Sequence, residues 1–396
     1  MSGANEQTES ARLSIGVGPH IREGEDIARI MWTVNLALAP IGVGALFLFG
    51  WYAGLVIATS VGACMAFEAI WQKLSGKRVT VGDGSAVITG MLLAFVLPPN
   101  VPLFVVVMAS GVAMIIAKHL FGRLGYNIWN PALVGRAFVQ IAYPALVTPP
   151  AWPIVTGSGF GRILQDVRNA APAGGAGQGV DAVSMAMQVG APAGASPQTF
   201  DAISMATPLG WPALQTFVPT AEGTVHPMYG SLKALFVGNV PGCIGETSAL
   251  LILVGGALLI YRGHINWKVP AVFLGTLFVF AFVFPTWKIT GAEWFSGLPR
   301  YETGLGAPER FFFPTYQILA GGAMLGAFFM ATDMVTTPET PRGQVIFAFG
   351  CGAITGAIRL LGHGFPEGCC YSILLMNTAT PMIDRYTRPT KYGAAR

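Results

Sequence analysis

The segment "MWTVNLALAPIGVGALFLFGWYAGLVIATSVGACMAFEAIW" (residues 31–71) decides the fold class of this chain. It carries one charged residue, Glu68, and Gly50 separates two apolar blocks within it. A transmembrane helix needs about 20 apolar residues, because each residue advances about 1.5 Å through a bilayer core about 30 Å thick. The segment therefore predicts two membrane-spanning helices, at 28–49 and 52–72.

The rest of the chain continues this pattern. Of the 396 residues, 53% are hydrophobic and 11% are charged, whereas a typical soluble domain has about 25% charged residues. We predict an all-α polytopic membrane protein of about ten transmembrane helices. The net charge of +4 reflects Lys and Arg in loops and does not indicate a nucleic-acid partner. The eight further apolar blocks are at 84–98, 101–119, 131–148, 246–262, 267–286, 314–332, 343–361 and 367–384.

The distribution of Lys and Arg predicts the orientation in the membrane. The first residues are polar and lack the small-residue cleavage site of a signal peptide, so we expect insertion into an inner membrane by the chain's own helices. Cytoplasmic loops are enriched in Lys and Arg, and the turns near 50 and 98–101 contain neither. Both termini are therefore expected in the cytoplasm. The basic residues placed on that side are Lys73, Lys77, Arg78, Lys118, Arg123, Arg262, Lys268, Arg342, Arg385, Arg388 and Lys391.

This orientation divides the chain into five segments. Residues 1–27 form a cytoplasmic N-terminal segment, and 28–148 form a first membrane half of five helices. Residues 149–245 form a large extracytoplasmic loop rich in Pro, Gly and Ala. A second five-helix half at 246–384 and a cytoplasmic tail at 385–396 complete the predicted organisation.

The third apolar block of each half is interrupted. The first, "SAVITGMLLAFVLPPN" (85–100), ends at two prolines, and the second, "LAGGAMLGAFFMATDMVTTP" (319–338), contains paired glycines and ends at a proline. Such segments at matching positions predict two inverted five-helix repeats around a site in mid-membrane. Ordinary glycine-rich helix packing explains the same residues at least as well.

The large loop contains one decapeptide twice, "DAVSMAMQVG" (181–190) and "DAISMATPLG" (201–210). Extended upstream, residues 171–190 match 191–210 at 11 of 20 positions, which indicates a tandem duplication. A surface loop tolerates such lengthening because closure entropy grows slowly with loop length. The copies differ where Met187 is replaced by Thr207, and only the threonine has a hydroxyl that can be esterified.

The second copy has the spacing D-x-x-S-x-A-T, formed by Asp201, Ser204, Ala206 and Thr207. This spacing resembles the target of flavin transferases, which join the phosphate of FMN to a threonine hydroxyl as a phosphoester. Ser204 and Ala206 are small enough to let a transferase approach. Met205 stands where glycine is usual, and its side chain could instead pack on the flavin. An ordinary turn threonine is the alternative interpretation.

Four blocks in order carry a resemblance to a known family. The blocks are "FEAIWQKLSGKRVTVGDGSAVITGMLLAFVLPP" (67–99), "LFGRLGYNIWNPALVGRAF" (120–138), "GNVPGCIGETSALL" (238–251) and "GHGFPEGCCYSILLMNTATPMIDRYT" (362–387). With them the chain resembles, from about residue 18 to 389, the D subunits of Rnf complexes, which are ion-translocating ferredoxin:NAD oxidoreductases. The B subunits of sodium-translocating NADH:quinone oxidoreductases are relatives, but the short N-terminus and the tail favour the Rnf subunits.

The resemblance implies a membrane-embedded electron carrier that catalyses no full reaction alone. FMN esterified to Thr207 would lie on the outer side, and riboflavin would be a second, non-covalent flavin. The implied partners are the other Rnf subunits (A, B, C, E and G), the flavin transferase and the lipid bilayer. Electron transfer would be coupled to translocation of Na⁺ or H⁺, and the sequence does not decide between these ions.

Polar residues inside predicted helices are candidates for function. Asn127, Asn130 and Arg136 are expected to meet polar atoms of a flavin. Asn130 before Pro131 also fits an ordinary helix cap, and an acidic neighbour is the alternative partner of Arg136. Three carboxylates are candidates for an ion path, with capping or first-turn charge as the alternative role. They are Asp83, Glu246 and Asp333.

Other charged residues are expected near helix ends. Glu68 and Arg359 are expected to reach the interface along their side-chain stems, and His119 and His363 to be interfacial. The five cysteines form no C-x-x-C motif, so no zinc or iron–sulfur site is expected from this chain alone.

Two alternatives to the Rnf interpretation stay open. One is a subunit of the quinone-reducing sister complex, which would show quinone-dependent NADH oxidation in membranes. The other is a non-redox solute channel or transporter built on the inverted repeat, which would show solute flux and no flavin.

Overall fold

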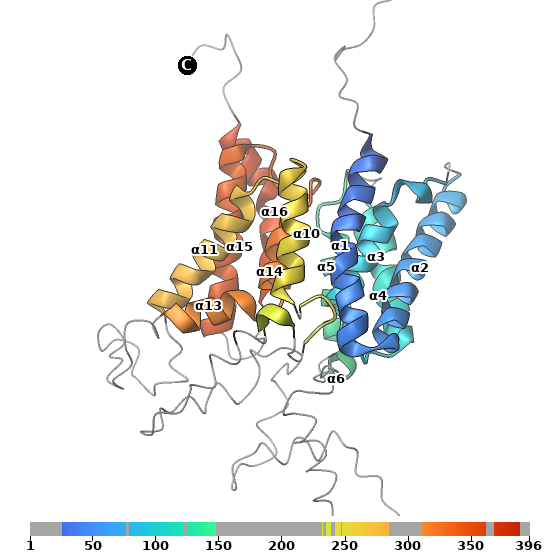
Figure 1. The fold of residues 1–396 in the computed structure, drawn as a ribbon. Coiled ribbons are helices and arrows are strands. Elements are labelled where there is room, and N and C mark those ends of the chain that lie inside the picture. The colour runs from blue at the N-terminus through green and yellow to red at the C-terminus, as the bar shows by residue number, and fades with distance from the viewer. Residues whose placement is uncertain are drawn as a thin grey trace, which may run out of the picture.

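A computed structural model describes residues 26–76, 79–121, 125–147, 232, 235–238, 242–246, 248–284, 311–361 and 368–388. Within these ranges every regular element is a helix (Figure 1). Three helices, α1, α2 and α15, are long and apolar enough to cross a membrane, and several shorter apolar helices accompany them. Apolar side chains such as Leu36 and Phe47 are exposed on the outside of the helices. This agrees with the predicted all-α polytopic membrane protein.

The first group of helices lies on one side of the molecule. α2 packs against α3 and α4, and α5 packs against α4 and its π-helical continuation η2. The backbone N–H of Leu120 donates to the carbonyl of Ile115, five residues earlier, as the wider π-helical turn requires. The elements are α1 (Ile27–Phe49), α2 (Trp51–Leu74), η1 (Val81–Asp83), α3 (Ser85–Phe95), α4 (Leu103–Gly111), η2 (Val112–His119), α5 (Pro131–Ala142) and α6 (Pro144–Val147).

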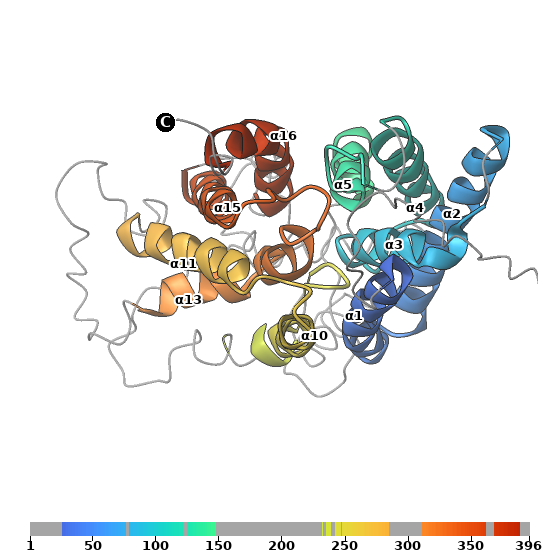
Figure 2. The ribbon, with the colours of Figure 1, turned by 90° about the horizontal axis from the view of Figure 1, so that it is seen from above.

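The second group of helices lies beside the first when the molecule is viewed along the helices (Figure 2). α11 packs against α13 and α15, and α15 packs against α16. Its elements are α10 (Ala249–Tyr261), α11 (Lys268–Val283), α13 (Phe312–Leu319), α14 (Ala323–Leu325), η7 (Gly326–Met330), α15 (Pro341–Leu361) and α16 (Cys369–Thr387). The predicted helix at 314–332 is therefore three short pieces, and the predicted tail boundary at 385 falls inside α16.

Both predicted interruptions are confirmed. α3 ends at Phe95, before the prolines that cannot continue a helix. α13 ends at Leu319, and Gly321 then adopts a φ of +66°, a left-handed conformation that strains residues with a Cβ. Each group thus contains a helix that covers only part of the membrane thickness.

The two interruptions are joined by a segment that precedes α10. The N–H of Ile244 donates to the carbonyl of Leu97 at 3.0 Å, and the N–H of Gly245 donates to the carbonyl of Phe95 at 2.8 Å. A Cβ on Gly322 would lie 2.7 Å from a Glu246 carboxylate oxygen, so this segment also touches the second interruption. The end of α3 is therefore satisfied by backbone from the other group of helices, as a helix end away from water requires.

One hydrophobic core connects the two groups of helices. It contains Ala37 and Leu38 of α1, Phe95 at the end of α3, and Phe328 and Phe329 of η7. α1 and α10 are in direct contact, and small residues on both helices bring their backbones close together.

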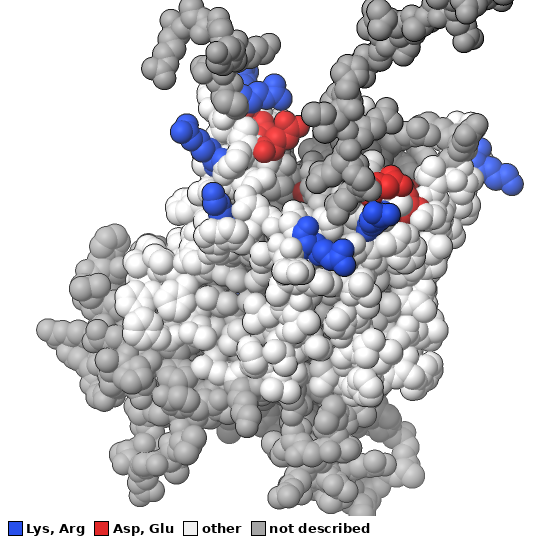
Figure 3. All heavy atoms as spheres, turned by 45° about the horizontal axis from the view of Figure 1, so that its top comes forward, with Lys and Arg blue, Asp and Glu red and all other residues white. Residues whose placement is uncertain are grey.

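Charged side chains gather at one end of the molecule, where α1 begins and α16 ends (Figure 3). Enrichment of Lys and Arg on one side is the feature from which the cytoplasmic side was predicted. Three basic residues do not follow it, because Lys118, Arg136 and Arg359 are buried. The described basic residues at this end are Arg29, Lys73, Arg262, Lys268, Arg342, Arg385 and Arg388.

Gly255 tests the contact between the two groups of helices. A Cβ at this position would lie 2.3 Å from the backbone oxygen of Ala37, so Gly255→Ala must push α10 away from α1. We expect a loss of about 1–3 kcal/mol, as for other overpacked sites, measured by thermal unfolding in mild detergent. Gly275→Ala is the matched control, because nothing lies within 4 Å of a Cβ there. Equal stability of the two variants would contradict the close approach.

Candidate functional site

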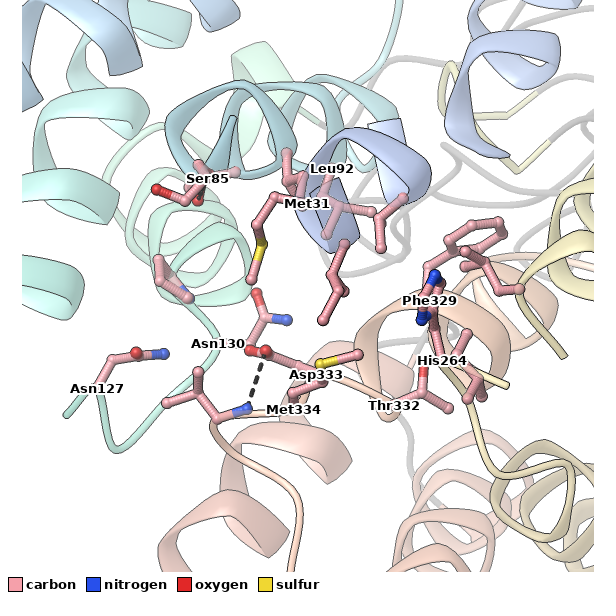
Figure 4. A pocket seen from close by; sticks show the side chains of 18 of the residues that line it. Met31, Ser85, Leu92, Asn127, Asn130, His264, Phe329, Thr332, Asp333 and Met334 are labelled. Atoms are coloured by element: carbon pink, nitrogen blue, oxygen red, sulfur yellow. Dashed lines mark hydrogen bonds between the residues drawn. The ribbon is translucent and has the colours of Figure 1, made fainter. Parts of the chain in front are cut away.

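A pocket opens between the two groups of helices near the charged end. Figure 4 shows Met31, Ser85, Leu92 and Asn130 of the first group around it, with Phe329 and other residues of the second group opposite. Its wall mixes apolar side chains with amides, hydroxyls, one ammonium and one carboxylate. The lining residues are Ile30, Met31, Val34, Ser85, Ile88, Thr89, Leu92, Lys118, Asn127, Asn130, Pro131, Leu259, His264, Ile265, Phe329, Thr332, Asp333, Met334 and Val335.

The two asparagines of "NIWNP" both line this pocket and both are buried. Asn130 is the N-cap of α5, where its Oδ1 accepts the N–H of Ala132 at 3.1 Å and Pro131 occupies the first helical position. The predicted capping role is confirmed. Asn127 donates from Nδ2 to the carbonyl of Trp129 at 3.3 Å, which holds its amide in the turn before the helix.

Asp333 enters the pocket from the loop that follows η7. Its carboxylate accepts the N–H of Val335 and the hydroxyl of Thr336, each at 3.3 Å. Burial raises the pKa of this loop carboxyl above its ordinary value, and these two hydrogen bonds oppose that rise. Asp333 therefore both shapes the loop and presents a carboxyl group to the pocket.

Asp83 lies one hydrogen bond away from the pocket. Its Oδ1 accepts both the backbone N–H and the hydroxyl of Ser85, each at 2.8 Å, at the start of α3. This satisfies one of the unpaired N–H groups of the first helical turn, as the predicted capping role requires. Ser85 itself lines the pocket.

A buried ion pair lies behind Ser85. Lys118 Nζ is 3.0 Å from Glu68 Oε1 and donates to Ser85 Oγ at 2.8 Å, and both charged side chains are almost completely buried. The expectation that Glu68 reaches the interface is wrong, and Lys118, which was expected on the cytoplasmic side, is buried in the bundle. Both residues lie near the ends of apolar blocks, where an acid and a base can face water or pair between neighbouring helices.

His119 and Arg359 are buried as well, contrary to expectation. The ring of His119 stacks on Trp71 at 6.1 Å, and its Nε2 is 3.8 Å from Glu68 Oε1. Arg359 Nη1 donates to the carbonyl of Gln317 in α13 at 2.6 Å. Tertiary contacts with neighbouring helices thus hold side chains that could otherwise extend to the interface.

Two other predicted residues lie outside the pocket. Arg136 is buried within α5 and is not among the pocket-lining residues. Glu246 precedes α10, whose N-cap is Ser248, so the alternative role of first-turn charge does not apply to it. It lies instead beside the interruption at Gly322.

The predicted covalent flavin site lies outside the described residues, as does His363. Among the residues that the structure does describe, no group of three or more His, Cys, Asp or Glu could hold a metal ion. All five cysteines are buried thiols. The predicted flavin site comprises Asp201, Ser204, Met205, Ala206 and Thr207.

Interrupted helices that meet inside an apolar bundle, beside a polar pocket between two groups of helices, define the class of polytopic membrane proteins whose sites are built from discontinuous helices. The chain belongs to the NQR2, RnfD, RnfE family, whose sequence pattern matches residues 14–393.

Relatives align over nearly the full length of the chain. It is 39% identical to the D subunit of the proton-translocating ferredoxin:NAD(+) oxidoreductase complex of Clostridium ljungdahlii, over 99% of this chain and 100% of that protein. It is 38% identical to the D subunit of the Na(+)-translocating ferredoxin:NAD(+) oxidoreductase complex of Acetobacterium woodii, over 97% and 96%. The D subunit of the ion-translocating oxidoreductase complex of Halorhodospira halophila is 35% identical, over 96% and 95%.

The buried ion pair predicts strong coupling between two variants. Lys118→Met leaves the Glu68 carboxylate buried without its cation, and Glu68→Gln leaves the ammonium without its anion. Each is expected to cost about 3–5 kcal/mol of unfolding free energy, whereas the double variant K118M/E68Q recovers most of that loss. Thermal unfolding of all four proteins in detergent measures this cycle, and strictly additive losses would argue against a direct pair.

Proposed function

We propose that this chain is the electron-carrying membrane subunit of an Rnf-type complex that passes electrons between ferredoxin and NAD and couples them to ion translocation. The observation that carries the proposal is the end-to-end similarity to proteins that are named as the D subunits of such complexes. Its partners are then the other Rnf subunits (A, B, C, E and G), in the bacterial inner membrane. The chain contributes a carrier and is not catalytic by itself.

We propose that FMN is attached to Thr207 through a phosphoester. The supporting observations are the spacing of Asp201, Ser204 and Ala206 before Thr207 and the hydroxyl that Met187 lacks in the first copy. A flavin transferase is then required for maturation.

The attachment is tested on the intact chain by mass spectrometry and by in-gel flavin fluorescence. Thr207→Val is expected to abolish covalent FMN, and Thr207→Ser, which keeps a hydroxyl, is expected to retain part of it. Adding Met187→Thr to Thr207→Val supplies D-x-x-S-x-A-T in the first copy and is expected to restore labelling there. Full labelling of Thr207→Val alone would exclude Thr207, and cells without the transferase provide the unlabelled control.

We propose that the pocket between the two groups of helices holds the non-covalent flavin, riboflavin. Met31, Leu92 and Phe329 supply apolar walls for an aromatic ring, and Asn127 and Asn130 supply amides for its polar edge. Arg136 does not line the pocket, so we assign the contact with the polar edge of the flavin only to the two asparagines. A bound flavin would supply a group that can accept and release electrons.

Asn127 provides the test of this site, since Asn130 is also a helix cap. Asn127→Leu is expected to lose most of the acid-extractable riboflavin per protein while covalent FMN stays unchanged. Asn266→Leu is the control, because this amide is at the same end but donates to Gln344 outside the pocket. Equal riboflavin content in the two variants would place the non-covalent flavin elsewhere.

We propose the finer organisation as predicted, with ten helices in two inverted five-helix repeats. Matching contacts in the two groups of helices support this organisation. α2 packs on α3 and α4, and α11 packs in the same way on α13 and α15. α5 packs on α4 and η2, and α16 packs in the same way on α15. The charged end would be cytoplasmic and the loop at 149–245 extracytoplasmic. Segment boundaries stay near 27, 148, 245 and 384.

We propose Asp333 and Glu246 as groups of the ion path, with Asp83 in a mainly capping role. Asp333 lies at the pocket and Glu246 at the joined interruptions. The relatives named for protons and for sodium are 39% and 38% identical to this chain, so similarity favours neither ion.

A further inference from the structure

Lys118 takes part in both the pocket wall and the buried ion pair. It lines the pocket, and it forms the ion pair with Glu68 behind the pocket wall. We propose that Lys118 is a positioning residue that holds a positive charge against the pocket and thereby favours the reduced, negatively charged state of the ring bound there. This inference rests on the proposed function, since it requires a redox-active ring in the pocket.

The burial of Lys118 gives its charge a large effect. Its side chain is 2% exposed, and charges in such surroundings interact more strongly than in water because the local dielectric constant is lower. Delivery of one electron by a reduced flavin or iron–sulfur carrier of a neighbouring subunit adds one negative charge to the pocket. No covalent bond changes in this step.

The neighbouring structure holds the ammonium in place. Glu68 and the hydroxyl of Ser85 accept from Nζ at 3.0 and 2.8 Å, and Asp83 fixes Ser85 in turn. Gln72 donates to Glu68 at 3.3 Å and is itself tied to Thr80. Protein side chains therefore hold Lys118 of η2 in place, and its position does not depend on what the pocket binds.

The other charges near the pocket make this cation necessary. Asp83 and Glu68 lie on the same side as Lys118, His119 is next to Glu68, and Asp333 and His264 line the pocket itself. A negative charge on any of these carboxylates opposes an added negative charge in the pocket, whereas the charge of Lys118 attracts it. Lys118 and Glu68 are therefore expected to shift the reduction equilibrium of the pocket in opposite directions.

The test is a redox titration of the purified complex. The signal that is monitored is the flavin component that Asn127→Leu removes. Lys118→Met is expected to lower the midpoint potential of this component, and Glu68→Gln is expected to raise it. The double variant K118M/E68Q should fall between them, and Lys118→Arg should stay near the wild type. At a fixed potential, each single change is expected to alter the ratio of reduced to oxidised ring on the order of tenfold.

A purely structural pair would lower stability without shifts of opposite sign, and the double variant controls for folding. An unchanged potential in Lys118→Met, or shifts of the same sign in both single variants, would overturn the inference and leave the proposed flavin site intact. Absence of acid-extractable flavin in the wild-type complex would instead overturn the proposed pocket function and this inference together, before any titration.

Discussion

Backbone hydrogen bonding at the interrupted helices is the constraint on which the rest of the structure depends. A helix that ends inside a bilayer exposes carbonyl groups that lipid cannot satisfy. Here the backbone of Ile244 and Gly245, from the second group of helices, donates to Leu97 and Phe95 at the end of α3. Because this partner comes from the other group, the two groups must lie together for the end of α3 to be satisfied.

The two partial helices also border the polar pocket. α3 and η7 reach only part of the way through the bundle, and their ends toward the charged side border the same pocket. Ser85 opens α3 and Asp333 follows η7, so both partial helices bring polar groups to the pocket. Asn127 and Asn130 complete the wall from the turn before α5. The pocket thus lies at the ends of the two partial helices, and the interruptions at Phe95 and Gly321 are outside its lining.

The Glu68–Lys118 pair shows how such a bundle keeps a charge close to its interior. A buried ion pair contributes little net stability compared with apolar residues, because both partners lose their hydration. Its retention beside a pocket is easier to understand if the ammonium acts on what the pocket binds. The surrounding bonds from Ser85, Gln72 and Asp83 serve to keep that charge at one position.

The sequence by itself determined the helical membrane class, the two interruptions and the cap at Asn130, because each follows from local rules. These rules are apolar length, the effect of Pro and Gly on a helix, and an amide before Pro131. The exact helix ends were less predictable, as the three short pieces between 312 and 330 show. Only the tertiary structure decided that Lys118 pairs with Glu68 and that Asn127 and Asp333 line one pocket. The physical reason is that a charged residue near a helix end can face either water or a neighbouring helix, and the packing of distant segments selects between them.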